Sequence, residues 1–235
     1  MDRRIGPVII ALLGLAFAMT ASETKGEEFY YVMIFGSQSK PKLLQYTHTW
    51  ATFIRAVGEG PDANNYSVYQ HTISWLPQSL DVRTWSLLPE PGVNLDLYRT
   101  LDAVYRDRER VTMWGPFRIQ QMAYERSLGV KAILDSGRAE YRAISTPRNL
   151  LISDCIHAVA AIDPVFGRGH YPLIRIGKPA SRFMARQVMI WSVFDQWQGD
   201  HTWLIPRLGL DRYPIEFISP RQIPKESCFL CRCPE

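Results

Sequence analysis

Cysteine is scarce in this chain, with four among 235 residues. The chain also lacks internal repeats and low-complexity segments, which excludes repeat architectures. It has no dense stripe of Lys or Arg, and its net charge of +4 is weak and scattered. We therefore expect no nucleic-acid partner. A hydrophobic content of 46% is ordinary for a globular protein with a core.

Long hydrophobic runs are also missing. The apolar run from Val8 to Met19 is uncharged and is shorter than the roughly 20 residues that a membrane span needs. It follows Arg3 and Arg4, and Ala16-Phe17-Ala18 within it fits a cleavage site. Residues 1–22 are therefore predicted to be a cleaved signal peptide, and the protein to be extracytoplasmic, either periplasmic or secreted. An uncleaved N-terminal anchor is the alternative.

The cysteines are unevenly placed, because three of them lie in the C-terminal tail, residues 221–235, as Cys228, Cys231 and Cys233. Three cysteines cannot all pair with one another. Either one stays free, or one pairs with Cys155, or the tail binds a metal. Zinc usually needs four ligands, and no second C-x-x-C motif exists, so we expect no metal and no cofactor. A redox or metal protein centred on this tail remains a separate hypothesis.

Three segments at the start of the predicted domain, residues 29–220, have the composition of β-strands. Residues 29–37 and 47–57 are rich in aromatic and β-branched residues. Residues 66–75 form a third such segment after a turn-rich loop over 58–65. These segments predict an antiparallel sheet.

Apolar residues recur at helical spacing in three segments, 94–108, 124–136 and 180–197. Ser153 is predicted to cap a further helix that runs to about Ile162. A short strand is predicted at 110–114, ended by Gly115-Pro116, and Pro89 to Gly92 is predicted to be a loop. A last strand is predicted at 212–218. Together these elements predict an α+β fold in which an antiparallel sheet packs against helices.

Cys155, within Ser153-Asp154-Cys155-Ile156-His157, is the most informative residue because it is predicted to lie at a helix start. Unpaired backbone N–H groups and the helix dipole lower the pKa of a thiol there from its ordinary value of about 8.5. The same N–H groups offer a site for an oxyanion. The carboxylate of Asp154 acts in the opposite direction, because it disfavours a thiolate. A thiol nucleophile also needs an imidazole base and a polar residue that orients it.

Two histidines on predicted strands are candidates for these roles. His48 shares one strand face with Trp50, and His71 shares one with Ile73. If the strands pair across the 58–65 loop, both histidines can lie on the same side of the sheet. A shift of one residue in register would reverse that arrangement.

Other histidines offer competing arrangements. His201 lies 46 residues after Cys155 and would suit an order in which the cysteine precedes the histidine. His170 lies in a glycine-rich loop. His157 is two residues beyond Cys155, so on a helix it points away from the thiol and is expected to be a packing or surface residue.

The order of these elements resembles that of the circularly permuted papain-like hydrolases, which include NlpC-type cell-wall peptidases and lecithin retinol acyltransferase. Thr47-His48-Thr49-Trp50 resembles their histidine strand, and His71-Thr72-Ile73-Ser74-Trp75 resembles the strand of the third residue. Ser153 to Val159 resembles the cysteine helix, and the resemblance covers residues 29–162. Relatives often carry Asn or Tyr where this chain has Asp154.

The resemblance implies a permuted papain-like fold with Cys155 as nucleophile, His48 as general base and His71 as the orienting residue. It implies an exported cysteine hydrolase or acyltransferase that acts on an amide or ester. The implied substrates are a cell-wall peptidoglycan peptide or a lipid acyl group, with peripheral association to the membrane or cell envelope. The alternative is a non-catalytic exported binding or scaffold protein that retains the fold.

Overall fold

The computed structural model describes residues 26–60, 62, 65–145, 150–163, 177–188 and 200–219. The predicted signal peptide, His170 and the three tail cysteines lie outside the described residues. Among the described helices, none has the length and apolar character needed to cross a membrane.

The central sheet has five strands in the order β3-β2-β1-β6-β9. These are β1 (Glu27–Gln38), β2 (Thr47–Gly58), β3 (Ser67–Ile73), β6 (Arg110–Ile119) and β9 (Ile215–Ile218). The first four run antiparallel to their neighbours, and β9 is parallel to β6. The three segments predicted to form an antiparallel sheet therefore do so.

A smaller sheet has the order β4-β5-β7-β8. Its strands are β4 (Trp75–Pro77), β5 (Glu90–Asn94), β7 (Glu140–Tyr141) and β8 (Ile152–Ser153). The prediction of a loop up to Gly92 is therefore wrong. Gly92 lies in β5, where it pairs with Pro77. Glycine is needed there because an added Cβ would lie 2.1 Å from the nearest ring atom of Trp75.

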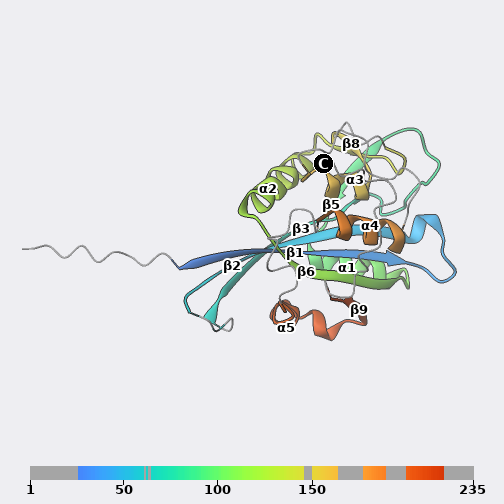
Figure 1. Cartoon of the computed structure of the whole chain (residues 1–235). Helices are drawn as coiled ribbons and strands as arrows, with labels where there is room; N and C mark the ends of the chain where they lie inside the picture. Colours follow the sequence, from blue (N-terminus) through green and yellow to red (C-terminus); the bar gives the residue numbers. More distant parts are fainter. Residues whose placement is uncertain are drawn as a thin grey trace, which may run out of the picture.

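Helices cover both faces of the central sheet (Figure 1). One face packs against α2 (Gln121–Asp135), α3 (Cys155–Ala160) and α4 (Lys178–Val188). The other face packs against α1 (Leu97–Arg106) and α5 (Leu204–Arg207). This arrangement of sheets packed against helices is the predicted α+β architecture. The predicted helix over 180–197 begins with α4, and residues 189–199 lie outside the described residues.

The two faces have separate hydrophobic cores, and strand alternation assigns each residue to one of them. Along β2, Ala51 and Phe53 belong to the core beneath α2, α3 and α4, whereas Trp50 and Ile54 belong to the core on the α1 side. Successive side chains of a strand point to opposite faces. The parity of a residue's position in β2 therefore decides which set of helices it meets.

The strand predicted to end at Gly115-Pro116 continues to Ile119, so that boundary was wrong. Gly115 has φ 107°, a conformation that glycine adopts readily. The pairing of β6 with β1 shifts register between Val32 and Ile34, opposite this point. A bulge of this kind takes up an extra residue without ending the strand.

Helix α1 ends in a left-handed turn at Arg108, which has φ 56°. The Arg108 N–H donates to the carbonyl of Tyr105, and the Glu109 N–H donates to that of Val104. Glycine is the usual residue at such a position. The turn leads directly into β6 and sets the position of Glu109.

Replacing Arg108 by Gly should raise the free energy of unfolding by about 1 kcal/mol, because glycine has no Cβ to resist a positive φ. Arg108 is exposed, so little packing is lost. Urea denaturation measures the change. The matched control is Arg106→Gly in the last helical turn, which should lower the free energy by about 1 kcal/mol. Equal destabilisation by both changes would contradict strain at Arg108.

Candidate functional site

Cys155 is the first residue of α3, but the helix is capped by Asp154 rather than by Ser153. A carboxylate oxygen of Asp154 accepts a hydrogen bond of 2.8 Å from the His157 backbone N–H. Ser153 lies in β8 instead, and its hydroxyl donates to the carbonyl of Leu150. The predicted helix start was therefore right within a residue and the predicted cap was wrong.

Asp154 belongs to a buried network that holds the first turn of α3. Its Oδ2 lies 2.7 Å from His157 Nδ1 and accepts a 2.8 Å hydrogen bond from the Ser145 hydroxyl. His157 is therefore a packing residue, which is one of the two environments predicted for it. Its bond to the capping residue Asp154 was not predicted. The i, i+3 spacing of Asp154 and His157 was the available signal, because side chains three apart meet on a helix.

The thiol of Cys155 is free and lies in a crowded place. Cys155 borders a cavity of about 50 Å³, together with Thr49, Tyr141 and Ala143. Burial raises the pKa of the thiol to about 12, and the Asp154 carboxylate adds to this effect. Hydrogen bonds from the backbone of Thr49, Cys155 and Ile156 oppose the rise only in part. Burial therefore outweighs the effect of the helix start on the pKa of this thiol, although part of the residue is accessible to solvent.

His48 and His71 lie on opposite faces of the central sheet, so the expectation of a shared face is wrong. The register pairs Phe53 of β2 with His71 of β3. Residues directly opposite each other in an antiparallel pair point to the same side, so His71 shares the face of Phe53. His48 is five positions before Phe53, an odd separation, and so it shares the other face with Trp50.

His48 is anchored on the α1 side. Its ring stacks on Trp50 with 5.3 Å between centroids, and its Nε2 lies 2.9 Å from the Ser74 hydroxyl oxygen. Ser74 in turn bonds to Thr100 of α1 at 2.8 Å. Burial lowers the pKa of His48 to about 3, so its imidazole is neutral at physiological pH. Its Nδ1 is buried and has no hydrogen-bond partner among the described residues.

His71 joins β3 to α2 and does not orient His48. Its Nε2 lies 2.8 Å from the Ser127 hydroxyl oxygen, and its ring stacks on Phe53. Burial lowers the pKa of His71 to about 4, and the charge of Lys131 contributes. These contacts describe a neutral histidine that bridges a strand and a helix.

The predicted trio is thus not joined into one hydrogen-bonded site. Within the described ranges, no hydrogen bond connects the Cys155 thiol to His48 or His71. Cys155 and His48 do border the same 50 Å³ cavity, which they reach from α3 and from β2. His201 packs edge-on against Tyr31, 4.9 Å between centroids, on the α1 side of the sheet. It therefore lies on the opposite face from Cys155.

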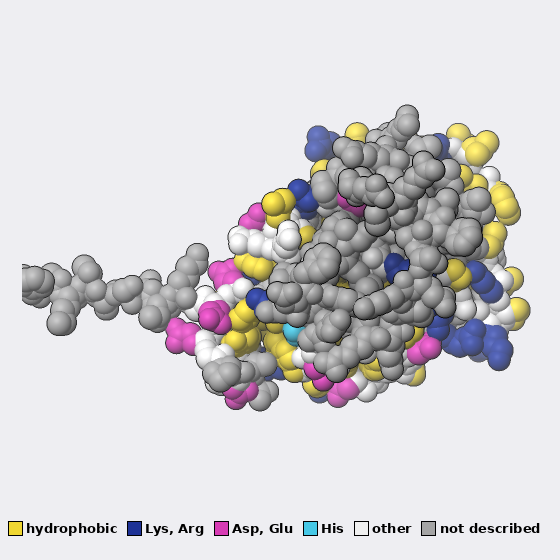
Figure 2. Space-filling view, in the orientation of Figure 1, with side chains coloured by type: hydrophobic (Ala, Val, Ile, Leu, Met, Phe, Trp, Pro, Cys, Tyr) yellow, Lys and Arg dark blue, Asp and Glu magenta, His cyan; other side chains and the backbone are white. Residues whose placement is uncertain are grey.

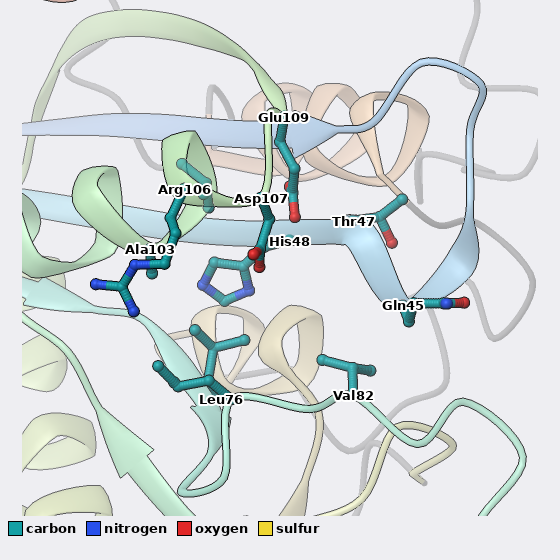
Figure 3. Close-up of a pocket in the computed structure, with 11 residues that line it drawn as sticks. Gln45, Thr47, His48, Leu76, Val82, Ala103, Arg106, Asp107 and Glu109 are labelled. Atoms are coloured by element: carbon teal, nitrogen blue, oxygen red, sulfur yellow. The ribbon is translucent and has the colours of Figure 1, made fainter.

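His48 also borders a second cavity of about 120 Å³, at the C-terminal end of α1. Figure 3 shows the His48 ring in this cavity with the side chains of Asp107 and Glu109 nearby and Leu76 and Val82 across from them. Two carboxyl groups and a neutral imidazole therefore share a space with an apolar wall.

Glu109 is the most perturbed acid of this second cavity. Burial raises its pKa to about 7, the Ser37 hydroxyl opposes the rise, and Asp107 adds to it. Its Oε2 is buried without a hydrogen-bond partner among the described residues. Sequence analysis did not identify Glu109. The only indication in the sequence was that an acidic residue directly precedes a predicted strand, and that strand proves to be buried.

These acids do not form a metal centre. In the part of the chain that the structure describes, no three His, Cys, Asp or Glu side chains gather closely enough to hold a metal ion. Comparison with protein-family models, curated proteins and solved structures finds no match for the chain. Its function must therefore be inferred from its own geometry.

Proposed function

We propose that this chain is a non-catalytic exported binding protein built on a permuted papain-like arrangement of sheet and helices. The observation that carries the proposal is the placement of Cys155 and His48 on opposite faces of β2. A general base must come within about 3 Å of the proton that it removes, directly or through one water. His48 instead bonds to Ser74 and stacks on Trp50.

The electrostatics of both groups support the same conclusion. A thiol with a pKa of about 12 is ionised in only about one molecule in 10⁵ at pH 7. An imidazole with a pKa of about 3 is a weak base. The cavity beside the thiol, about 50 Å³, is small beside the roughly 300–1,000 Å³ of typical ligand pockets.

A cysteine hydrolase or acyltransferase is the second candidate, and two observations favour it. Backbone N–H groups of Cys155 and Ile156 are directed at the sulfur, as they would be at a site that binds an oxyanion. Cys155 and His48 also border one cavity. This function would require His48 to leave Ser74 and reach the other side of β2.

Alkylation by iodoacetamide between about pH 6 and pH 11 separates the two functions. We expect Cys155 of the native protein either to resist labelling or to react with an apparent pKa above about 9. Mass spectrometry of the peptide that contains Cys155 distinguishes it from the tail cysteines. His48→Ala should leave the apparent pKa of labelling unchanged, because His48 Nε2 bonds to Ser74 and not to the thiol.

The controls are Cys155→Ser, which must abolish labelling of this peptide, and the urea-unfolded protein, which should show an ordinary thiol pKa of about 8.5. His71→Ala serves as a matched change at a second buried histidine. An apparent pKa below about 7 that rises in His48→Ala but not in His71→Ala would establish the hydrolase instead.

A further inference from the structure

The loop between β4 and β5 exposes three large apolar side chains. Trp85, Leu87 and Leu88 have 78%, 76% and 79% of their surface accessible. The next most exposed large apolar side chain among the described residues is Tyr69, at 56%. Singly exposed apolar side chains are ordinary, but a group of large ones exposed within one short loop is typical of an interaction site.

The loop between β1 and β2 extends this patch. Gln45 of that loop lines the same cavity as Leu80 and Val82 of the β4–β5 loop, so the two loops lie side by side. Figure 1 shows both loops at one end of the molecule. We call the exposed apolar residues of the two loops the apolar rim: Leu43, Tyr46, Leu80, Trp85, Leu87 and Leu88.

The backbone of the rim holds one conformation that leucine rarely adopts. Leu80 has φ 59°, in the left-handed region that favours glycine. Strain of this kind persists where the surrounding structure fixes it, and it concentrates at functional segments. Leu80 lies at the start of the segment that presents Trp85.

The two loops that form the apolar rim carry more basic than acidic residues. The two loops, residues 39–46 and 78–89, contain three cations, Lys40, Lys42 and Arg83, and one acidic residue, Asp81. The side chain of Arg142 donates to the carbonyl of Leu87, so a fourth cation lies at the edge of the rim. Figure 2 shows hydrophobic and basic side chains side by side at this end of the molecule.

The basic character continues into a groove beside the β1–β2 loop. This groove, of about 530 Å³, is bordered by Lys42 together with Lys178, Arg182 and Arg186 of α4. Lys178 is paired with Glu216, which reduces its charge toward solvent. Together with Lys40 and Arg83 of the two loops, basic side chains outnumber acidic ones at this end of the protein, which suits it to an anionic surface.

We infer that the apolar rim docks onto an anionic lipid bilayer. Tryptophan is enriched at the level of lipid headgroups, where its ring meets both water and acyl chains. Lys and Arg near the surface are attracted by anionic lipids. Trp85, Leu87 and Leu88 enter the headgroup region, while the cations of both loops contact lipid phosphates.

A second copy of the chain fits this surface less well. A two-fold dimer places the same patch of both copies face to face, so the cations around the rim would meet one another. A bilayer with anionic headgroups offers the opposite charge. This inference rests on the proposed binding function, for which it names the partner, and thiol labelling tests that function separately.

Hydrogen exchange with and without vesicles tests the docking site in the full chain. With vesicles of phosphatidylcholine and phosphatidylglycerol at about 3:1, backbone amides of residues 78–89 should exchange at least about tenfold more slowly. Pure phosphatidylcholine vesicles, or about 0.5 M NaCl, should remove most of that protection. This local readout distinguishes docking through the rim from binding through another part of the chain.

Two variants sharpen the test. Trp85→Ser, Leu87→Ser and Leu88→Ser combined should abolish the protection of the loops and lower vesicle binding about tenfold relative to the unchanged chain. The matched control, Tyr69→Ser with Leu128→Ser, removes exposed apolar side chains elsewhere and should change neither quantity.

Two results would overturn the inference. One is unchanged exchange over 78–89 in the presence of anionic vesicles. The other is a dimer in light scattering that the triple variant converts to a monomer while vesicle binding is absent, because the rim would then join two copies. Neither result alters the labelling of Cys155, so the proposed function would stand or fall independently.

Discussion

Replacing Glu109 by Gln should raise the free energy of unfolding by about 3 kcal/mol at pH 8.5 and by less than about 1 kcal/mol at pH 5. Burial raises the pKa of Glu109 from 4.5 to about 7, so the folded protein holds a proton that the unfolded chain releases. The stability from this proton is complete below pH 4.5 and is lost as the pH rises through 7. Gln keeps the shape of the protonated side chain and cannot ionise.

Urea denaturation at both pH values measures this effect. The matched control is Glu140→Gln, because Glu140 is exposed in a short strand, and it should change the free energy by less than about 0.5 kcal/mol at either pH. A gain from Glu109→Gln that is the same at pH 5 and pH 8.5 would show that packing, and not ionisation, is responsible.

In the Glu109→Gln background, acidification from pH 7.5 to pH 5 should lower the free energy of unfolding by about 4 kcal/mol. Burial lowers the pKa of His48 from 6.5 to about 3 and that of His71 to about 4. Below pH 6.5 the unfolded chain takes up protons that the folded protein cannot bind. The stability is therefore complete above pH 6.5 and is lost as the pH falls toward the folded values.

Single substitutions divide this loss between the two histidines. His48→Gln and His71→Gln should each reduce the acid-induced loss of stability by about 2 kcal/mol. The reason is that pH 5 is 1.5 units below the ordinary histidine pKa of about 6.5. His201→Gln is the control, since His201 is only partly buried and packs on Tyr31. The comparison requires that each variant be folded at both pH 7.5 and pH 5. An unchanged slope in both variants would refute the buried-histidine account.

Local pattern was enough to predict much of the fold. The aromatic and β-branched segments became β1, β2 and β3, and the helical spacings found α1 and α2, because burial of one face imposes a period on the sequence. The strand β5 was missed because its glycine makes room for Trp75, which is a tertiary requirement. The continuation of β6 past Gly115 was missed for a similar reason, since the bulge depends on its pairing with β1.

The candidate site was less predictable because it depends on register. The positions of His48 and His71 in their strands were foreseen, but the face on which each lies follows from the pairing of Phe53 with His71. Nothing in the strands alone fixes that pairing. The choice of Asp154 as cap was equally hidden, because Ser153 is as good a capping residue and the decision rests on bonds to Ser145 and His157.

Side chains along β2 alternate between the two faces of the sheet, and this alternation decides which of them can lie near the Cys155 thiol. Thr49, one position after His48, lies on the same side as α4, where its hydroxyl bonds to Ser181, and its backbone contacts the Cys155 thiol. The His48 imidazole thus lies on the opposite face from the thiol, although the next residue along the strand contacts the thiol. Moving a histidine by a single position along this strand would transfer it across the sheet, so one step in sequence decides whether an imidazole lies on the same face as the Cys155 thiol.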